Sequence, residues 1–363
     1  MRIGLDQVMK KGINSIIRQD CLKILKEVDL SSLKDQSVLL TGSNGLLGSC
    51  IANVIYFANK ELSLNCRLYC VSLHEPSDAI ARLLDDGRIL AIAADISKGL
   101  EFDKKIDYIF HAACYGQPKK YLEDKFKTIT LNVDAVRSLL ELAKSKCAKF
   151  MFFSSADVYG DIPAEVMPAP ETYSGNILTT SPRAIYGESK RMGETICSIY
   201  RRDHDVGARI VRISHVYGPG LSINDERVLG SFIKKAIFEK EIRMMDSGSA
   251  VKTFGYISDV ISMILKVMLH GTDFVYNVGG EDRVSILRLA EEVAKHCGNI
   301  PVKASKKEER VEHIKTDNRL VGLDISKYEK EFGKMKFVEF SDGIKRTVQW
   351  NIEEFGLKRN KEK

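Results

Sequence analysis

The sequence predicts an α/β fold, with a doubly wound parallel sheet followed by a smaller mixed α/β domain. From residue 37 onward, short apolar runs alternate with longer segments of helical periodicity, which is typical of a parallel sheet covered by helices on both faces. The first apolar run enters the glycine-rich stretch 38–48, VLLTGSNGLLG, which indicates a strand that turns sharply into a helix. After residue 213 the alternation gives way to loops and helices, so we expect the smaller domain to begin there.

The N-terminal segment 1–36 is expected to be a helical extension. Apolar residues recur in it at helical spacing, so one face should cover the core or a partner subunit. Residues 37–213 follow as a dinucleotide-binding domain of the Rossmann type. We expect its strands at 37–41, 67–72, 89–94, 108–111, 149–154 and 208–213, and its main helices at 45–58, 128–146 and 183–202.

The rest of the chain is expected to bind substrate. Residues 214–350 should form the smaller domain, in which glycine-containing loops alternate with helices near 228–238, 258–269 and 285–297. Residues 351–363 are a charged tail that ends in a dense basic run from Lys358 to Lys363. We expect that run to be solvated.

The composition of the chain limits the kinds of ligand and partner that we expect it to bind. With 55 basic and 49 acidic residues, the 363-residue chain has a formal net charge of +6, and its basic residues are scattered. This charge suits an anionic small ligand and does not favour nucleic acid. No apolar run has the length of a signal or membrane segment, so we expect no membrane partner. The eight cysteines show no CxxC pair or zinc spacing, so we expect no metal and buried free thiols in a cytoplasmic protein.

The glycine stretch has the chemistry of a phosphate site. Gly42, Gly45 and Gly48 let the backbone turn tightly and approach a pyrophosphate. The free N–H groups and the positive dipole at the start of the following helix favour the negative charge of a phosphate. Taken alone, the same stretch is equally compatible with an ordinary turn between a strand and a helix.

A second motif, Tyr186-Gly187-Glu188-Ser189-Lys190, lies on an expected helix. Residues four apart share a helix face, so the ammonium of Lys190 can lie beside the phenol of Tyr186. A nearby cation should lower the tyrosine pKa from its usual value of about 10 and make it a usable base. Outside any other context, such a pair would be a surface pair.

Ser155 is placed to act with this pair. It follows the strand expected at 149–154, in the segment FSSADVYG of residues 153–160. Open parallel sheets carry their sites at the carboxyl ends of the strands, so Ser155 could reach the same substrate oxygen as Tyr186. The alternative is that Ser154 and Ser155 only cap a turn.

The order of these motifs resembles the extended short-chain dehydrogenase/reductases that modify nucleotide sugars. The similarity covers about residues 36–350 and continues into the segment GSAVKTFGYISD at 248–259. Within the family, the segment PRAIYGESKR at 182–191 resembles most the UDP-glucuronate decarboxylases. The matching motifs are TGSNGLLG at 41–48, Asp95-Ile96, HAA at 111–113, Asn132, SSADVYG at 154–160 and the YxxxK motif at 186–190.

The resemblance implies NAD as cofactor and oxidation of a sugar at C4. Tyr186 would take the proton of the C4 hydroxyl, Ser155 would orient that hydroxyl, and Lys190 would also contact the nicotinamide ribose. The cofactor would be held by Gly42, Asn44, Gly45, Leu46, Leu47, Gly48, Ser72, Asp95, Ile96, Ala112, Ala113, Asn132, Tyr186 and Lys190.

The step after C4 oxidation depends on the residues that flank Ser155. Related 4,6-dehydratases carry Asp-Glu there, and this chain has Ala156-Asp157. Alanine cannot supply a proton, whereas Asp157 carries the charge of the glutamate found in decarboxylases, which makes Asp157 a catalytic candidate. We therefore favour a decarboxylase, with a 4-epimerase as the main alternative and a 4,6-dehydratase third. A binding protein without catalytic activity is the alternative from another class.

Other departures from the family concern the cofactor and the substrate. Ser72 replaces the acid that usually binds the adenosine ribose, so NADP is not excluded. His215 stands where relatives often have asparagine, and Lys252 stands where they have a diphosphate-binding arginine. The expected substrate contacts are Tyr115, Gln117, His215, Arg227 and Lys252. The family also implies a homodimer through the helices at 128–146 and 183–202.

Overall fold

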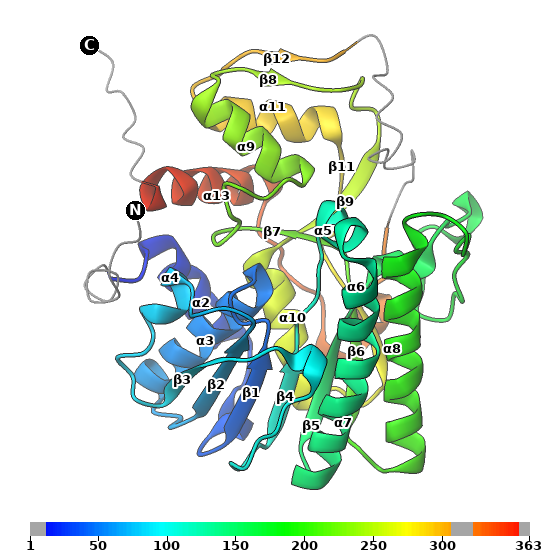
Figure 1. Ribbon diagram of the computed structural model, residues 1–363. Helices are drawn as coiled ribbons and strands as arrows, with labels where there is room; N and C mark the ends of the chain where they lie inside the picture. Colours follow the sequence, from blue (N-terminus) through cyan, green and yellow to red (C-terminus); the bar gives the residue numbers. More distant parts are fainter. Residues whose placement is uncertain (1–11, 306–321, 356–363) are drawn as a thin grey trace.

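The apolar runs of the sequence form a seven-stranded parallel sheet (Figure 1). The computed structural model describes residues 12–305 and 322–355. The basic run from Lys358 to Lys363 and the first residues of the N-terminal extension lie outside this part. In the order β10-β6-β5-β4-β1-β2-β3, the sheet contains β1 (Ser37–Thr41), β2 (Arg67–Ser72), β3 (Ile89–Ala93), β4 (Tyr108–His111), β5 (Lys149–Ser155), β6 (Ala208–Ile213) and β10 (Val275–Val278).

The expected doubly wound α/β fold is confirmed, and the six expected strands are present. The seventh strand, β10, was not expected, and it pairs with β6. It comes from the segment 214–350, which we assigned to the smaller domain. The main sheet is therefore completed by a part of the chain that follows most of the smaller domain.

Helices cover both faces of the sheet (Figure 1). One face packs against α2 (Ser15–Glu27), α3 (Leu46–Leu62) and α10 (Ile257–His270). The other face packs against α7 (Asp134–Lys146) and α8 (Ala184–Asp203), beside which lies α6 (Lys125–Asn132). The single helix expected at 128–146 is thus two helices, because the backbone at Val133 departs from helical geometry (φ −119°, ψ −67°).

The smaller domain lies beyond the carboxyl end of β6. Only Ser214 separates β6 from β7 (His215–Tyr217), which pairs with β9 (Val251–Tyr256) and not with the main sheet. β9 also pairs with β11 (Asp282–Ser285), in antiparallel orientation. The other elements of this domain are α9 (Val228–Phe238), β8 (Ile242–Arg243), α11 (Ile286–His296), β12 (Val302–Lys303) and α13 (Phe340–Glu354). α12 (Ser326–Phe332) instead packs against β10 of the main sheet.

Short elements connect these layers. They are η1 (Ser31–Leu33), α4 (Asp78–Ala81), η2 (Ile96–Lys98), α5 (Pro118–Glu123), η3 (Ala156–Tyr159) and η4 (Ala164–Val166). In the described part of the chain, no helix is long and apolar enough to cross a membrane. Five of the eight cysteines are buried, and Cys114 and Cys297 are partly buried; the expectation that they are buried is wrong for Cys147, which is exposed in the left-handed C-cap of α7.

Candidate active site

The turn between β1 and α3 is sterically fixed by its glycines. Gly42 has φ +74°, and a Cβ on it would lie 2.7 Å from the backbone of Ala113. A Cβ on Gly48 would lie 2.3 Å from the carbonyl oxygen of Gly42. Any larger residue at either position would push the turn away from the end of β4 or from the start of α3. The two glycines are therefore required by close backbone packing.

The start of α3 has the properties of an anion site. Gly45 is its N-cap, and the helix has neither a side-chain cap nor an acidic residue in its first turn. The first N–H groups of a helix have no partner within the helix, so Leu46, Leu47 and Gly48 present backbone donors there. The side chains of Leu46 and Leu47 pack against the core. These properties fit the pyrophosphate of a dinucleotide.

Asn44 and Ser72 hold the loop after β2. The Asn44 amide donates to the Ser72 hydroxyl at 3.0 Å and to the Glu75 carbonyl at 2.9 Å, and it accepts from the Ser77 N–H at 2.9 Å. The Ser72 hydroxyl donates to the carbonyl oxygen of His74 at 2.6 Å. Asn44 therefore fixes the loop that would face the adenosine ribose.

The next two strands add further candidate contacts. Asp95 caps η2 through the Ser97 N–H and hydroxyl, and these hydrogen bonds lower the pKa of its carboxyl. Ile96 is buried beside it. The backbone of Ala112 and Ala113 packs against Gly42, as described above. These residues lie at the same edge of the sheet as the glycine turn, because parallel strands end together.

Lys190 is a buried residue of α8. Only 1% of it is exposed, and its ammonium donates to the carbonyl oxygen of Phe153 at 2.7 Å and lies 4.7 Å from the centroid of the Phe152 ring. Burial lowers the pKa of Lys190. The Asn132 amide donates to the Ser189 hydroxyl at 3.0 Å, which ties α6 to the same part of α8. The YxxxK motif is therefore not a surface pair.

Tyr186 is also buried, with its ring centroid 5.9 Å from the Lys190 ammonium. Our expectation that its pKa is lowered is wrong for this structure. Burial raises the pKa of Tyr186, the nearby Cys114 and Asp157 raise it further, and the Ser155 hydroxyl lowers it. The Cys114 sulfur lies 4.0 Å from the phenol oxygen. The sequence shows the neighbouring cation but not the burial that outweighs it.

Ser155 and Asp157 lie together at the end of β5. The Ser155 hydroxyl donates to the Asp157 carboxylate at 3.3 Å and accepts from the Asp157 N–H at 3.2 Å. Asp157 is exposed, whereas Ser155 is half-buried. The structure thus supports both readings of Ser155, because it caps η3 and its side chain also lies beside Tyr186.

Tyr121 is a site residue that the sequence reasoning missed. Its ring stacks on the ring of Tyr186, with centroids 5.0 Å apart and planes at 12°. Its hydroxyl accepts a hydrogen bond from Nε of Arg183 at 3.2 Å. The available signal was a tyrosine on the short helix α5, directly after the loop that contains Gln117. A single aromatic residue on a short helix does not point to a site without its tertiary contacts.

Three of the five expected substrate contacts lie near one another around His215, on which the charge of Asp157 also acts. His215 and Arg227 line a cavity of about 30 Å³, and the charges of Arg227 and Lys252 act on His215. Arg227 forms a two-point contact with Asp225, with distances of 2.6 to 3.1 Å. Lys252 is buried on β9. The smaller domain therefore brings cations to the end of the main sheet where Ser155 lies.

The other two expected substrate contacts have different surroundings. Tyr115 is half-buried against the apolar cluster that includes Ile96 and Leu131. Gln117 is the N-cap of α5. Their roles remain predictions.

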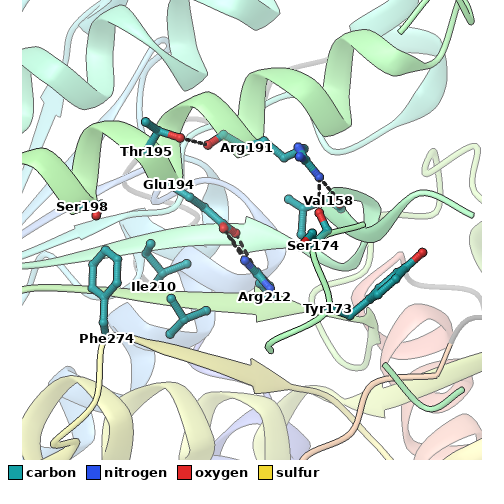
Figure 2. Close-up of a pocket in the computed structure, with 11 residues that line it drawn as sticks. Val158, Tyr173, Ser174, Arg191, Glu194, Thr195, Ser198, Ile210, Arg212 and Phe274 are labelled. Carbon is teal, nitrogen blue, oxygen red and sulfur yellow. Dashed lines mark hydrogen bonds and ion pairs between the residues drawn. The ribbon is translucent and has the colours of Figure 1, made fainter. Parts of the chain in front are cut away.

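A larger hollow, of about 280 Å³, lies beside α8 (Figure 2). Figure 2 shows Glu194 of α8 facing Arg212 of β6, and their closest contact is 2.7 Å. The Ser154 hydroxyl donates to Glu194 at 2.6 Å, and Arg212 donates to the Tyr159 hydroxyl at 3.0 Å. Because these partners precede and follow Ser155 in the chain, the ion pair supports the active-site segment and is not part of the reacting cluster.

The comparisons with known proteins agree with this geometry. Residues 38–279 match the model of the NAD dependent epimerase/dehydratase family. UDP-glucuronic acid decarboxylase 5 of Arabidopsis thaliana is 29% identical over 308 residues, which cover 85% of this chain and 86% of that protein.

Two solved structures are similar at a TM-score of 0.73. A dTDP-glucose 4,6-dehydratase from Streptomyces venezuelae, crystallised with NAD, is 21% identical, with 88% of this chain and 98% of that chain covered. A UDP-glucuronic acid 4-epimerase from Bacillus cereus, in complex with UDP-glucuronic acid and NAD, is 22% identical, with 88% and 100% covered. At these identities the two structures support the fold.

Proposed function

Because this chain belongs to the NAD dependent epimerase/dehydratase family of enzymes, we propose that it oxidises UDP-glucuronate at C4 and then decarboxylates it to a UDP-pentose. The observation that carries this proposal is the cluster of Ser155, Tyr186 and Lys190 beside the charged group that contains Asp157 and His215. The family uses NAD, and the relative from Arabidopsis thaliana is named for this decarboxylation.

The residues of the cofactor side fit NAD. The glycine turn and the uncapped start of α3 would hold the pyrophosphate, Asp95 and Ile96 would hold the adenine, and Lys190 would contact the nicotinamide ribose. NAD, when bound, supplies the acceptor for a hydride from C4 and later returns it. The protein contributes position and proton transfer.

Tyr186 exchanges a proton with the C4 oxygen of the sugar, and Ser155 orients that oxygen. The Lys190 ammonium stabilises the negative charge that forms on the phenol when its proton leaves. The ring of Tyr121 fixes the orientation of Tyr186 by stacking on it. Oxidation at C4 places a ketone β to the C6 carboxylate.

The second step needs little from the protein. The C5–C6 bond breaks, carbon dioxide leaves, and the electron pair of that bond moves toward the C4 ketone, whose oxygen takes the proton of Tyr186 to give an enol. C5 then takes up a proton. The charge of the site suits this substrate, because Arg183 and Lys252 provide cations for a diphosphate and a carboxylate, beside Arg227, whose charge is shared with Asp225. Asp157 lies within this cluster and bonds to Ser155.

A 4-epimerase is the second candidate. Ser155, Tyr186 and Lys190 suffice for it, and Asp157 would then have no chemical task. A 4,6-dehydratase ranks third because Ala156 cannot act as an acid. A nucleotide-binding protein without activity would leave the buried Tyr186 and Lys190 without a use.

Product analysis tests the proposal. The NAD-loaded protein is incubated with UDP-glucuronate and the products are identified by NMR. We expect carbon dioxide and a UDP-pentose, and a loss of roughly 10²- to 10⁴-fold in turnover for Tyr186→Phe. UDP-galacturonate as the product would establish the epimerase instead. No turnover of any nucleotide sugar tested would favour the binding protein.

We also propose a homodimer through the helices of residues 128–146, which are the end of α6 and the whole of α7, and through α8. Phe126 on α6 is 83% exposed, and Met192 and Ile199 on α8 are 50% and 39% exposed. Apolar side chains that gather on neighbouring helices favour a partner surface. Sedimentation at micromolar concentration should give twice the mass of the 40.8 kDa chain; a monomer would contradict the proposal.

A further inference from the structure

His215 begins strand β7 where two neighbouring strands of the main sheet end. Ser155 pairs with Ile213 across β5 and β6, so Asp157 and His215 each lie two residues beyond the paired positions. His215 also pairs with Phe254 of β9, and the two rings lie 5.8 Å apart. The imidazole is thus placed between the Ser155 end of the sheet and the smaller domain.

The imidazole has an unused hydrogen-bonding atom. Its Nδ1 is buried and has no partner among the described residues. The ring also lines the cavity of about 30 Å³ that Arg227 and Phe254 share. A buried polar atom without a partner costs free energy, and a ligand that bonds to it recovers that cost. The imidazole therefore has an atom that can form a hydrogen bond to a ligand.

Charged side chains from four segments act on the imidazole: Asp157 of η3, Arg183 before α8, Arg227 before α9 and Lys252 of β9. Burial lowers the pKa of His215, Asp157 offsets part of this effect, and the three cations lower the pKa again, so that it is about 4 in total. The imidazole is therefore neutral near pH 7 in the protein alone. Since the cations are one cause of this, a ligand that neutralises them must raise the pKa again.

We propose that His215 takes up a proton when a nucleoside diphosphate sugar binds, and then donates a hydrogen bond from Nδ1 to an anionic oxygen of the ligand. This inference rests on the proposed function, which supplies the anionic ligand. The proton comes from the solvent, and no bond of the substrate changes. A uronate adds three negative charges to the site, whereas a neutral hexose adds only the two of the diphosphate. His215 therefore favours the uronate, in a way that the asparagine of many relatives cannot.

Calorimetry on the full-length, NAD-loaded protein tests this inference. UDP-glucuronate is titrated into Tyr186→Phe, in which turnover is suppressed, because decarboxylation of the substrate would itself consume a proton. The titration is done at about pH 6, near the ordinary pKa of imidazole, in two buffers that differ in ionisation enthalpy. The difference in heat gives the number of protons taken up. We expect about one proton per ligand for Tyr186→Phe and about none when His215→Asn is added to it. His204→Asn in the same background, a change at an exposed histidine, is the control and should keep the uptake of Tyr186→Phe.

Two further measurements make the result decisive. UDP-glucose, which lacks the carboxylate, should give a smaller proton uptake than UDP-glucuronate. The ¹⁵N chemical shifts of His215 should change from a neutral to a protonated ring when UDP-glucuronate binds to Tyr186→Phe, which leaves His215 itself unchanged. Binding without proton uptake, or equal uptake in His215→Asn, overturns the role of His215 and leaves the proposed function intact. If neither ligand binds, both are overturned.

Discussion

The two sides of Tyr186 are built in different ways. The cofactor side, as we propose it, comprises the glycine turn 42–48, Ser72, Asp95 and Ala112-Ala113, and it depends on close backbone contacts such as that between Gly48 and Gly42. The proposed substrate side is a group of charged and titratable side chains that come from separate segments: Asp157, Arg183, His215, Arg227 and Lys252.

This difference explains why part of the cofactor side can be predicted from a sequence motif, whereas the substrate side cannot. Within the cofactor side, the glycine turn 42–48 is one continuous stretch that fixes its own conformation and forms the anion site, so the types and spacing of its residues are enough to predict that site. On the substrate side, the geometry depends on where β7, α9 and β9 return to the main sheet. The substrate side is therefore held by long-range interactions, and the following changes distinguish the two sides.

Removing Glu194 should have the largest effect. Glu194 and Arg212 are 12% and 14% exposed, and they anchor the segment around Ser155. Loss of one partner leaves a mostly buried charge, so Glu194→Ala should lower the free energy of unfolding by roughly 3–5 kcal/mol. Urea unfolding measures this. The control is Glu226→Ala, which breaks an exposed pair with Lys119 and should cost less than about 1 kcal/mol. Equal losses would show that the network does not support the substrate side.

Gly48→Ala should weaken NAD binding without affecting the proposed substrate side. The new Cβ would lie 2.3 Å from the Gly42 carbonyl oxygen, so the turn must shift. Overpacking of this kind costs about 1–3 kcal/mol, and we expect NAD to bind roughly 10- to 100-fold more weakly. Gly87→Ala is the matched control, because nothing lies within 4 Å of the added Cβ. Unchanged NAD affinity in Gly48→Ala, measured by fluorescence titration, would contradict the role of the turn.

Features that depend on one continuous stretch of chain could be predicted from the sequence, whereas features that depend on distant segments could not. Buried parallel strands are continuous apolar runs, so β1 to β6 are visible in the sequence to within a residue. The strand β10 is only four residues long and returns after the smaller domain, so no local pattern assigns it to the main sheet. Tyr121 and the raised pKa of Tyr186 were missed for the same reason, because both depend on burial between distant segments.

A titration in acid compares buried groups on the two sides. His111, on the cofactor side, bonds to Thr41 at 2.8 Å, and burial lowers its pKa from 6.5 to about 3. A histidine whose pKa is lower in the folded protein than in the unfolded chain binds a proton more readily when the chain unfolds. The free energy of unfolding therefore decreases as the pH falls below 6.5. Between pH 8 and pH 5, His111 should lower the free energy of unfolding by about 2 kcal/mol.

His111→Gln should remove the contribution of His111 to the pH dependence of the free energy of unfolding, and His215→Asn should remove a contribution of similar size. UDP-glucuronate should suppress the contribution of His215 and leave that of His111 unchanged. The ligand effect can be measured by urea unfolding at both pH values. Equal suppression of both contributions would show that the two sides do not respond separately to the substrate.

The smallest expected effect concerns the choice between NAD and NADP. Ser72 stands where an acid usually repels a 2′-phosphate, and its hydroxyl already bonds to Asn44 and His74. Ser72→Asp keeps an acceptor for the Asn44 amide and adds a negative charge. We expect the ratio of the NADP and NAD dissociation constants to rise about tenfold, or about 1.4 kcal/mol. Ser72→Ala, which adds no charge, should leave the ratio within about twofold. If Ser72→Asp also leaves the ratio unchanged, the loop fixed by Asn44 holds the ribose through its backbone, and the cofactor side is independent of side-chain charge even at its rim.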